Sequence, residues 1–199
     1  MLTAVVQAGG ESTRMGEDKA LKVFLGRALI ERVIDRLRSL TDDVVVTTNR
    51  PEPYRFLGLP LVADLRPGRG ALGGLYTALE AAQAPLVAVV ACDLPFVSAA
   101  LLAHAADVLT KEGVDVVIPE SAEGLEPLHA VYRRATCLPA VEAALDAGQW
   151  KVIAWFPQVK VRVLSRTECA PWDEGGLAFW NVNTPAEFAE AEARALAAR

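Results

Sequence analysis

The sequence is poor in the residues that most metal centres, disulfide frameworks and acid–base sites use. It has two histidines in 199 residues, and its three cysteines, Cys92, Cys137 and Cys169, show no CxxC spacing. An odd number of widely spaced cysteines indicates reduced thiols that are mostly buried. A Cys/His metal site is not expected, because His104 and His129 are the only imidazoles available to it.

Long apolar runs and an excess of basic residues are also missing. No run reaches the ~18 residues of a transmembrane helix, and the first residues lack a basic segment and a cleavage signal, so a soluble cytoplasmic protein is expected. The net charge of −5 argues against non-specific binding to nucleic acid or to an anionic membrane. It leaves an anionic small substrate open, because a local basic pocket suffices for one.

Apolar segments with the period of strands alternate with segments that have the period of helices. With 52% hydrophobic residues and no linker or repeat, the chain is most simply one domain over residues 1–199. Alternating strands and helices predict an α/β protein, with a mostly parallel central sheet and helices on both faces. The expected strands are 2–6, 44–48, 59–63, 85–91, 114–119, 127–132 and 159–164, and the expected helices are 28–40, 71–82, 98–111, 135–147 and one from 184 onward.

A glycine-rich stretch, Gln7 to Leu21, follows the first expected strand. Glycines allow the backbone to approach a ligand closely and to direct amide N–H groups at an anion. Arg14 and Lys19 in the same stretch can neutralise phosphate charge. The stretch therefore predicts a phosphate-binding loop at the carboxyl end of this strand.

Three further expected strands are followed by polar side chains, namely Asn49, Asp64 and Asp93. Ligands of open α/β sheets bind at the carboxyl ends of the strands, so we expect these residues near the loop. Asp93 follows the most apolar strand, and its carboxylate suits Mg²⁺, which shares substrate phosphates. Turn-forming roles remain open for Asn49 and Asp64.

A second glycine-rich segment offers an alternative. The run from Gly68 to Gly73 matches G-x-G-x-x-G, opens a helix and precedes Asp93 by about twenty residues, which is a pattern of NAD-binding proteins. Its context is poor, because the preceding strand is short and separated from the motif. No Walker A motif and no G-x-S-x-G elbow occurs.

Several motifs taken together resemble the molybdenum cofactor guanylyltransferases, along nearly the whole chain. They are Ala8-Gly9-Gly10, Arg14-Met15-Gly16, Asp18-Lys19, Cys92-Asp93-Leu94-Pro95, the stretch from Glu126 to Tyr132, and Asn181-Val182-Asn183-Thr184-Pro185. The resemblance implies a Rossmann-like three-layer sandwich. Related cytidylyltransferases tend to have Ala-Ala-Gly and a proline before the lysine, so Ala8-Gly9-Gly10 and Asp18-Lys19 favour guanine. Gln7 departs from the leucine usual in the family.

The resemblance also implies roles for individual residues. Gln7, Ala8, Gly9 and Gly10 would meet the nucleotide, and Arg14, Lys19 and Asp93 would be catalytic, with Asp93 as the Mg²⁺ ligand and Lys19 also on the phosphates. The remaining implied residues are Asn49 and Asp64 for further nucleotide contacts, Gly70 and Gly73 in a loop over the nucleotide, and Asn181 and Asn183 for the acceptor.

The implied reaction is transfer of GMP from GTP to the terminal phosphate of molybdopterin, with release of pyrophosphate. A phosphate monoester is a competent nucleophile near neutral pH, so positioning and charge neutralisation would suffice. The implied partners are GTP, molybdopterin and other proteins of molybdenum cofactor synthesis. Two alternatives stay open: a transferase that uses CTP or another phosphorylated acceptor, and a non-catalytic protein that binds nucleotide or cofactor.

Overall fold

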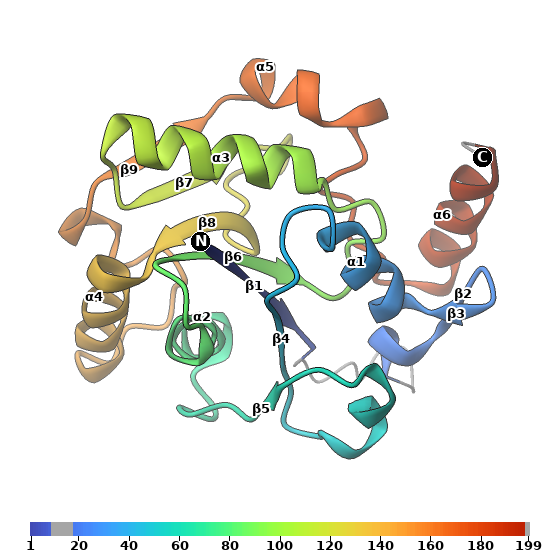
Figure 1. The fold of residues 1–199 in the computed structure, drawn as a ribbon, viewed down its shortest axis with the longest axis horizontal. Helices are drawn as coiled ribbons and strands as arrows, with labels where there is room; N and C mark the ends of the chain where they lie inside the picture. The colour runs from blue at the N-terminus through green and yellow to red at the C-terminus, as the bar shows by residue number, and fades with distance from the viewer. Residues whose placement is uncertain (9–17, 198–199) are drawn as a thin grey trace.

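The computed structural model describes residues 1–8 and 18–197, and its centre is a seven-stranded sheet (Figure 1). Across the sheet the strands lie in the order β5-β4-β1-β6-β8-β7-β9. All neighbours are parallel except β8, which is antiparallel to both β6 and β7, so the predicted mostly parallel sheet is confirmed. The strands are β1 (Leu2–Gln7), β4 (Val44–Thr47), β5 (Leu61–Val62), β6 (Leu86–Ala91), β7 (Val116–Pro119), β8 (His129–Arg133) and β9 (Val161–Leu164).

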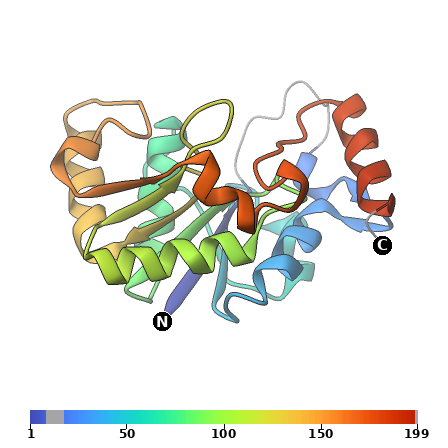
Figure 2. The ribbon, with the colours of Figure 1, turned by 90° about the horizontal axis from the view of Figure 1, so that it is seen from above.

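Helices cover both faces of this sheet, as expected, and Figure 2 shows the layers from a second side. Side chains alternate along β1, so that Ala4 and Val6 join the core under α1 and α3, whereas Val5 joins the core under α2 and α4. The α-helices are α1 (Leu29–Leu37), α2 (Gly70–Ala81), α3 (Ala99–Glu112), α4 (Arg134–Asp146), α5 (Arg166–Cys169) and α6 (Pro185–Ala197). No helix of the described residues has both the length and the apolar character needed to cross a membrane.

A two-stranded hairpin and α6 form a third, smaller cluster beside the sheet. β2 (Val23–Phe24) and β3 (Arg27–Ala28) lie next to α6 in both views (Figures 1 and 2). The ring of Phe24 meets that of Phe188 edge to face at 5.3 Å, and the backbone N–H of Leu25 donates to Glu192 of α6 at 2.8 Å. Short 3-10 helices complete the chain: η1 (Lys19–Leu21), η2 (Glu52–Leu57), η3 (Phe156–Gln158), η4 (Ala170–Trp172) and η5 (Glu174–Gly176).

The register of the central strands aligns their carboxyl ends. Gln7, the last residue of β1, pairs with Thr47 of β4 on one side and with Ala91 of β6 on the other. The chain segments that follow these three strands therefore leave the sheet at the same level, where a ligand site of an open α/β sheet is expected. The three cysteines are unpaired, and Cys137 and Cys169 are buried, which confirms the expectation of reduced, mostly buried thiols.

Candidate functional site

A cavity of about 360 Å³ lies at the carboxyl edge of the central strands. It is bounded by the ends of β1 and β6, by η1, by the segment before β8 and by the segment before α6. The structure therefore gathers residues from distant parts of the chain into one site. The residues assigned to the site from the sequence that line it are Gln7, Ala8, Lys19, Asp93, Asn181 and Asn183.

Lys19 links two walls of this cavity. Its Nζ donates to Oδ1 of Asn183 at 2.7 Å and lies 3.4 Å from Oδ2 of Asp93. Both partners of the ion pair are about four-fifths buried, with side chains 18% and 20% exposed. An ammonium group carries three donors, so Lys19 can bind a phosphate oxygen in the cavity while it keeps both contacts.

Asp18 positions Lys19. Its Oδ1 caps η1 by accepting the backbone N–H of Ala20 at 3.2 Å. Its Oδ2 accepts from the hydroxyl of Tyr54 at 2.8 Å and from the guanidinium of Arg50 at 3.0 Å. Burial and the Asp18 carboxylate raise the pKa of Tyr54, which stays a donor. The sequence motif included Asp18 without a role, and the structure shows that it ties the Lys19 segment to η2.

Asp93 is held by backbone contacts on both sides. The N–H of Cys92 donates to the carbonyl of Gln7 at 3.1 Å, and the carbonyl of Asp93 accepts the N–H of Val182 at 3.0 Å. These bonds join the end of β6 to β1 and to the segment that carries Asn183. The main chain at Asp93 is therefore fixed, and the carboxylate lies beside Lys19.

The segment before α6 is fixed by a capping box that Thr184 and Glu187 form. Glu187 accepts the N–H groups of Asn183 at 2.7 Å and of Thr184 at 2.9 Å, and Thr184 Oγ1 accepts the N–H of Glu187 at 3.2 Å. The backbone bond from Asn183 is the main cause of the lowered pKa of the Glu187 carboxyl. The helix start thus holds Asn183 where it meets Lys19.

Asn49 and Asp64 lie outside the cavity and contact each other. Asn49 Nδ2 donates to Asp64 Oδ2 at 3.1 Å, and the N–H of Asp64 donates to Asn49 Oδ1 at 2.8 Å. They follow β4 and β5, on the side of β1 away from β6. They form a second group along the sheet edge, and their nucleotide contacts stay a prediction.

The predicted glycines of α2 do not line the cavity either, but their neighbour Gly74 lies close to the side chain of Gln7, which does. A Cβ on Gly73 would stand 2.8 Å from the carbonyl of Arg66, and Gly70 has a φ of +57°, so both positions favour glycine. A Cβ on Gly74 would stand 3.1 Å from Oε1 of Gln7. The start of α2 thus packs on the Gln7 side chain. Gly9, Gly10 and Arg14 lie outside the described residues, and their roles stay predictions.

Glu126 is a cavity residue to which the sequence interpretation gave no role. It precedes β8, whose amino end lies at the carboxyl edge of β6 because the two strands are antiparallel. Hydrophobic periodicity does not reveal strand direction, so a polar residue before a strand gave no signal. The half-buried Glu126 carboxyl has a raised pKa because burial removes it from water.

His129 also belongs to β8 and is fully buried. Burial lowers its pKa to about 4, with the Ser98 carbonyl opposing the shift. Its Nε2 lies 3.5 Å from that carbonyl, and its ring lies 5.0 Å from Phe179. His129 does not line the cavity and belongs to the buried interior.

Comparison with known proteins gives consistent results. A family profile described as "MobA-like NTP transferase domain" matches residues 4–162. The chain is 37% identical, over all its 199 residues and 98% of the relative, to a molybdenum cofactor guanylyltransferase of Desulfosudis oleivorans. It is also 37% identical to a probable molybdenum cofactor guanylyltransferase of Pelotomaculum thermopropionicum, over 97% of this chain and 93% of the relative.

Solved structures of related proteins have the same fold as this chain. The molybdopterin-guanine dinucleotide biosynthesis protein A of Archaeoglobus fulgidus superposes with a TM-score of 0.84 at 26% identity, over 99% of this chain and all of that one. A 4-diphosphocytidyl-2C-methyl-D-erythritol synthase of Anaerococcus prevotii shares the fold, with a TM-score of 0.73 at 14% identity over 98% and 96% of the two chains. The chain belongs to the MobA-like NTP transferase family and, within it, to the molybdenum cofactor guanylyltransferases.

Proposed function

We propose that the protein transfers GMP from GTP to the terminal phosphate of molybdopterin and releases pyrophosphate. The observation that carries the proposal is the meeting of Lys19, Asp93 and Asn183 in one cavity at the carboxyl edge of the sheet. Lys19 neutralises phosphate charge, and Asn183 holds Lys19 in place. The names of the full-length relatives supply the substrates.

The donor set around Asp93 fits Mg²⁺ that is shared with substrate. The described residues contain no cluster of three or more His, Cys, Asp or Glu side chains suited to a metal. Mg²⁺ usually takes one or two protein carboxylates and completes its shell with water and phosphate oxygens. We therefore assign Asp93 as the protein ligand. When bound, the ion supplies charge neutralisation at the triphosphate.

The residues of the chain act by positioning and electrostatics. The acceptor phosphate is itself the nucleophile and needs no strong base, which agrees with a cavity that His129 does not line. Lys19 binds the phosphates, together with the phosphate-binding loop that the sequence predicts, and Asp93 keeps the Lys19 ammonium oriented. The cytoplasm as the place of the reaction stays a prediction from the sequence.

Nucleotide-dependent thermal stability tests the proposal. Ligands that bind the folded state raise the unfolding midpoint by mass action. We expect GTP with Mg²⁺ to raise the midpoint and CTP, UTP and NAD to leave it nearly unchanged. An equal or larger shift with CTP would indicate that the protein transfers a cytidylyl group and not a guanylyl group. A shift with NAD alone would contradict the proposal that the protein is a nucleotidyltransferase.

A further inference from the structure

A second cavity, of about 470 Å³, adjoins the candidate site and shares Glu126 with it. The loop after β7, the helix α5 with the turns that follow it, and the pair Phe179 and Trp180 form its walls. We call it the acidic cavity, because its lining includes Glu120, Glu123, Glu126 and Asp173 but one basic residue, Arg166. Its volume lies in the range of small-molecule sites.

The charge of the acidic cavity selects what it can bind. A phosphate is repelled there, because the carboxylates outnumber the single guanidinium. A ligand group rich in N–H donors is attracted by the same carboxylates. One of them, Asp173, accepts an N–H group within the protein, because its Oδ1 bonds to the N–H of Ala178 at 2.7 Å. The half-buried Glu126 has a raised pKa because of burial, so donors from a ligand would restore interactions that its ionised form lost with water.

The aromatic wall is held in place. Trp180 stacks on Phe96 with a centroid distance of 5.9 Å and an interplanar angle of 15°, and the guanidinium of Arg194 lies 5.2 Å from the Trp180 ring. Phe179 contacts the buried ring of His129. A flat conjugated ligand therefore meets an apolar side whose rings are already positioned.

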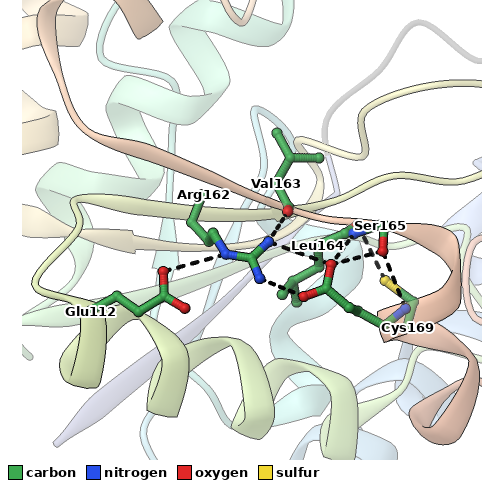
Figure 3. Close-up of polar contacts among 7 residues, drawn as sticks. Glu112, Arg162, Val163, Leu164, Ser165 and Cys169 are labelled. Carbon is green, nitrogen blue, oxygen red and sulfur yellow. Dashed lines mark hydrogen bonds and ion pairs between the residues drawn. The ribbon is translucent and has the colours of Figure 1, made fainter.

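A second wall of the cavity, α5, is anchored as well (Figure 3). Ser165 caps this short helix, and its Oγ donates to Glu168 at 2.7 Å. Arg162 of β9 pairs with Glu168 and, at 3.3 Å, with Glu112 of α3. The bond from Arg162 lowers the pKa of Glu168 to about 2. The cavity is thus lined by elements tied to the sheet.

The order of the strands separates this cavity from the predicted nucleotide residues. Asn49 and Asp64 follow β4 and β5 on one side of β1, whereas the acidic cavity lies toward β7 and β9 on the other side of β6. Lys19 and Asp93 stand between them at the ends of β1 and β6. Two substrates that react beside Lys19 and Asp93 would therefore extend in opposite directions, one toward Asn49 and Asp64 and the other toward the acidic cavity.

Given the proposed function, on which this inference rests, we propose that the acidic cavity binds the pterin ring of the acceptor and that Glu126 recognises its amino-pyrimidine edge. A pterin presents two parallel donors, N3–H and the 2-amino group, which match the two oxygens of a carboxylate. Its body is flat and suits the aromatic wall. The phosphate of the acceptor then points away from the carboxylates, toward Lys19.

Binding of an unphosphorylated pterin tests this inference without turnover. The probe is 6-hydroxymethylpterin, titrated by fluorescence, and it is compared with 6-hydroxymethyllumazine, in which an oxo group replaces the 2-amino group. We expect wild-type protein to bind the pterin at least about tenfold more tightly than the lumazine. Glu126→Gln should weaken pterin binding by about tenfold and abolish the preference, because an amide also donates to the oxo group.

Two controls accompany this experiment. Glu52→Gln, a change of the same kind at an exposed residue of η2, should leave both affinities unchanged. The titration is repeated with saturating GTP and Mg²⁺, because guanine carries the same donor edge as pterin. Pterin binding that persists with GTP supports the proposal.

Two results would overturn the assignment of the acidic cavity. One is displacement of the pterin by GTP, which would assign the cavity to guanine. The other is an unchanged preference for pterin in Glu126→Gln. A wild-type protein that binds pterin but shows no thermal shift with GTP would contradict the proposed function, and the acidic cavity would then be a pterin site without a role in guanylyl transfer. A GTP shift without pterin binding would contradict this inference alone.

Discussion

At the scale of single residues, Gln7 is the one whose role the structure sharpens most. Its side chain leaves β1 toward α2, against Gly74, and lines the candidate cavity. Its Nε2 is buried, and no described residue accepts a hydrogen bond from it. A buried donor without an acceptor costs about 1–3 kcal/mol. A nucleotide in the cavity can supply that acceptor, which gives a reason for glutamine where the family usually has leucine.

Gln7→Leu should therefore separate stability from binding. We expect the free energy of unfolding, from urea titration, to rise by about 1 kcal/mol, because the variant lacks the buried donor. We expect the affinity for GTP with Mg²⁺ to fall by about tenfold. Gln83→Leu, at an exposed position after α2, is the matched control. Lower stability with unchanged affinity would show that Gln7 supports the fold and does not contact the nucleotide.

At the scale of secondary-structure elements, the long periodic segments were predictable and the short or direction-dependent ones were not. The sequence predicts strand 85–91, and β6 spans Leu86–Ala91; it predicts helix 71–82, and α2 spans Gly70–Ala81. The helix expected to reach Leu40 ends at Leu37 in α1, where the chain turns and Thr41 Oγ1 bonds to the carbonyl of Leu2. Such a tertiary contact has no local pattern.

The residues of the candidate site also fall into those that the sequence predicts and those that it does not. Residues that follow parallel strands, such as Asp93, can be predicted from the sequence, because the carboxyl ends of parallel strands lie at the same edge of the sheet. Glu126 was missed because it precedes β8, and only the pairing of β8 with β6 brings its amino end to that edge. Asp18 was missed as a positioning residue because its partner Tyr54 belongs to η2, a segment for which the sequence predicts no element.

At the scale of the whole molecule, the buried His129 makes folding stability depend on pH. Its folded-state pKa of about 4 lies below the ordinary value of 6.5. The unfolded chain therefore binds a proton more readily, and the stabilising contribution is complete above pH 6.5 and lost as the pH falls toward 4. The loss amounts to about 3 kcal/mol at most.

Unfolding titrations across this range measure the effect. His129→Gln should flatten the slope of the free energy of unfolding between pH 6.5 and 4, whatever its absolute stability. Glu168, with its pKa of about 2, contributes at lower pH, and its effect remains in the variant. An unchanged slope in His129→Gln would mean that the imidazole is protonated in the folded protein, contrary to its burial.

The molecule as a whole is organised around the edge where β1 and β6 end. The predicted nucleotide residues flank this edge on the β4 and β5 side, and the acidic cavity flanks it on the β7 and β9 side. Lys19 and Asp93 lie between the two. The central claim is that this pair serves transfer of a guanylyl group from one side to the other.

The most direct measurement follows GTP labelled at its α-phosphate, with molybdopterin and Mg²⁺, in wild-type protein and in Asp93→Ala. We expect label in the acceptor and release of pyrophosphate with the wild type. In Asp93→Ala we expect transfer to fall by about a thousandfold or more at an unchanged unfolding midpoint. Asp107→Ala, at an exposed residue of α3, should retain full activity. Near-wild-type transfer by Asp93→Ala would contradict a role of Asp93 in guanylyl transfer.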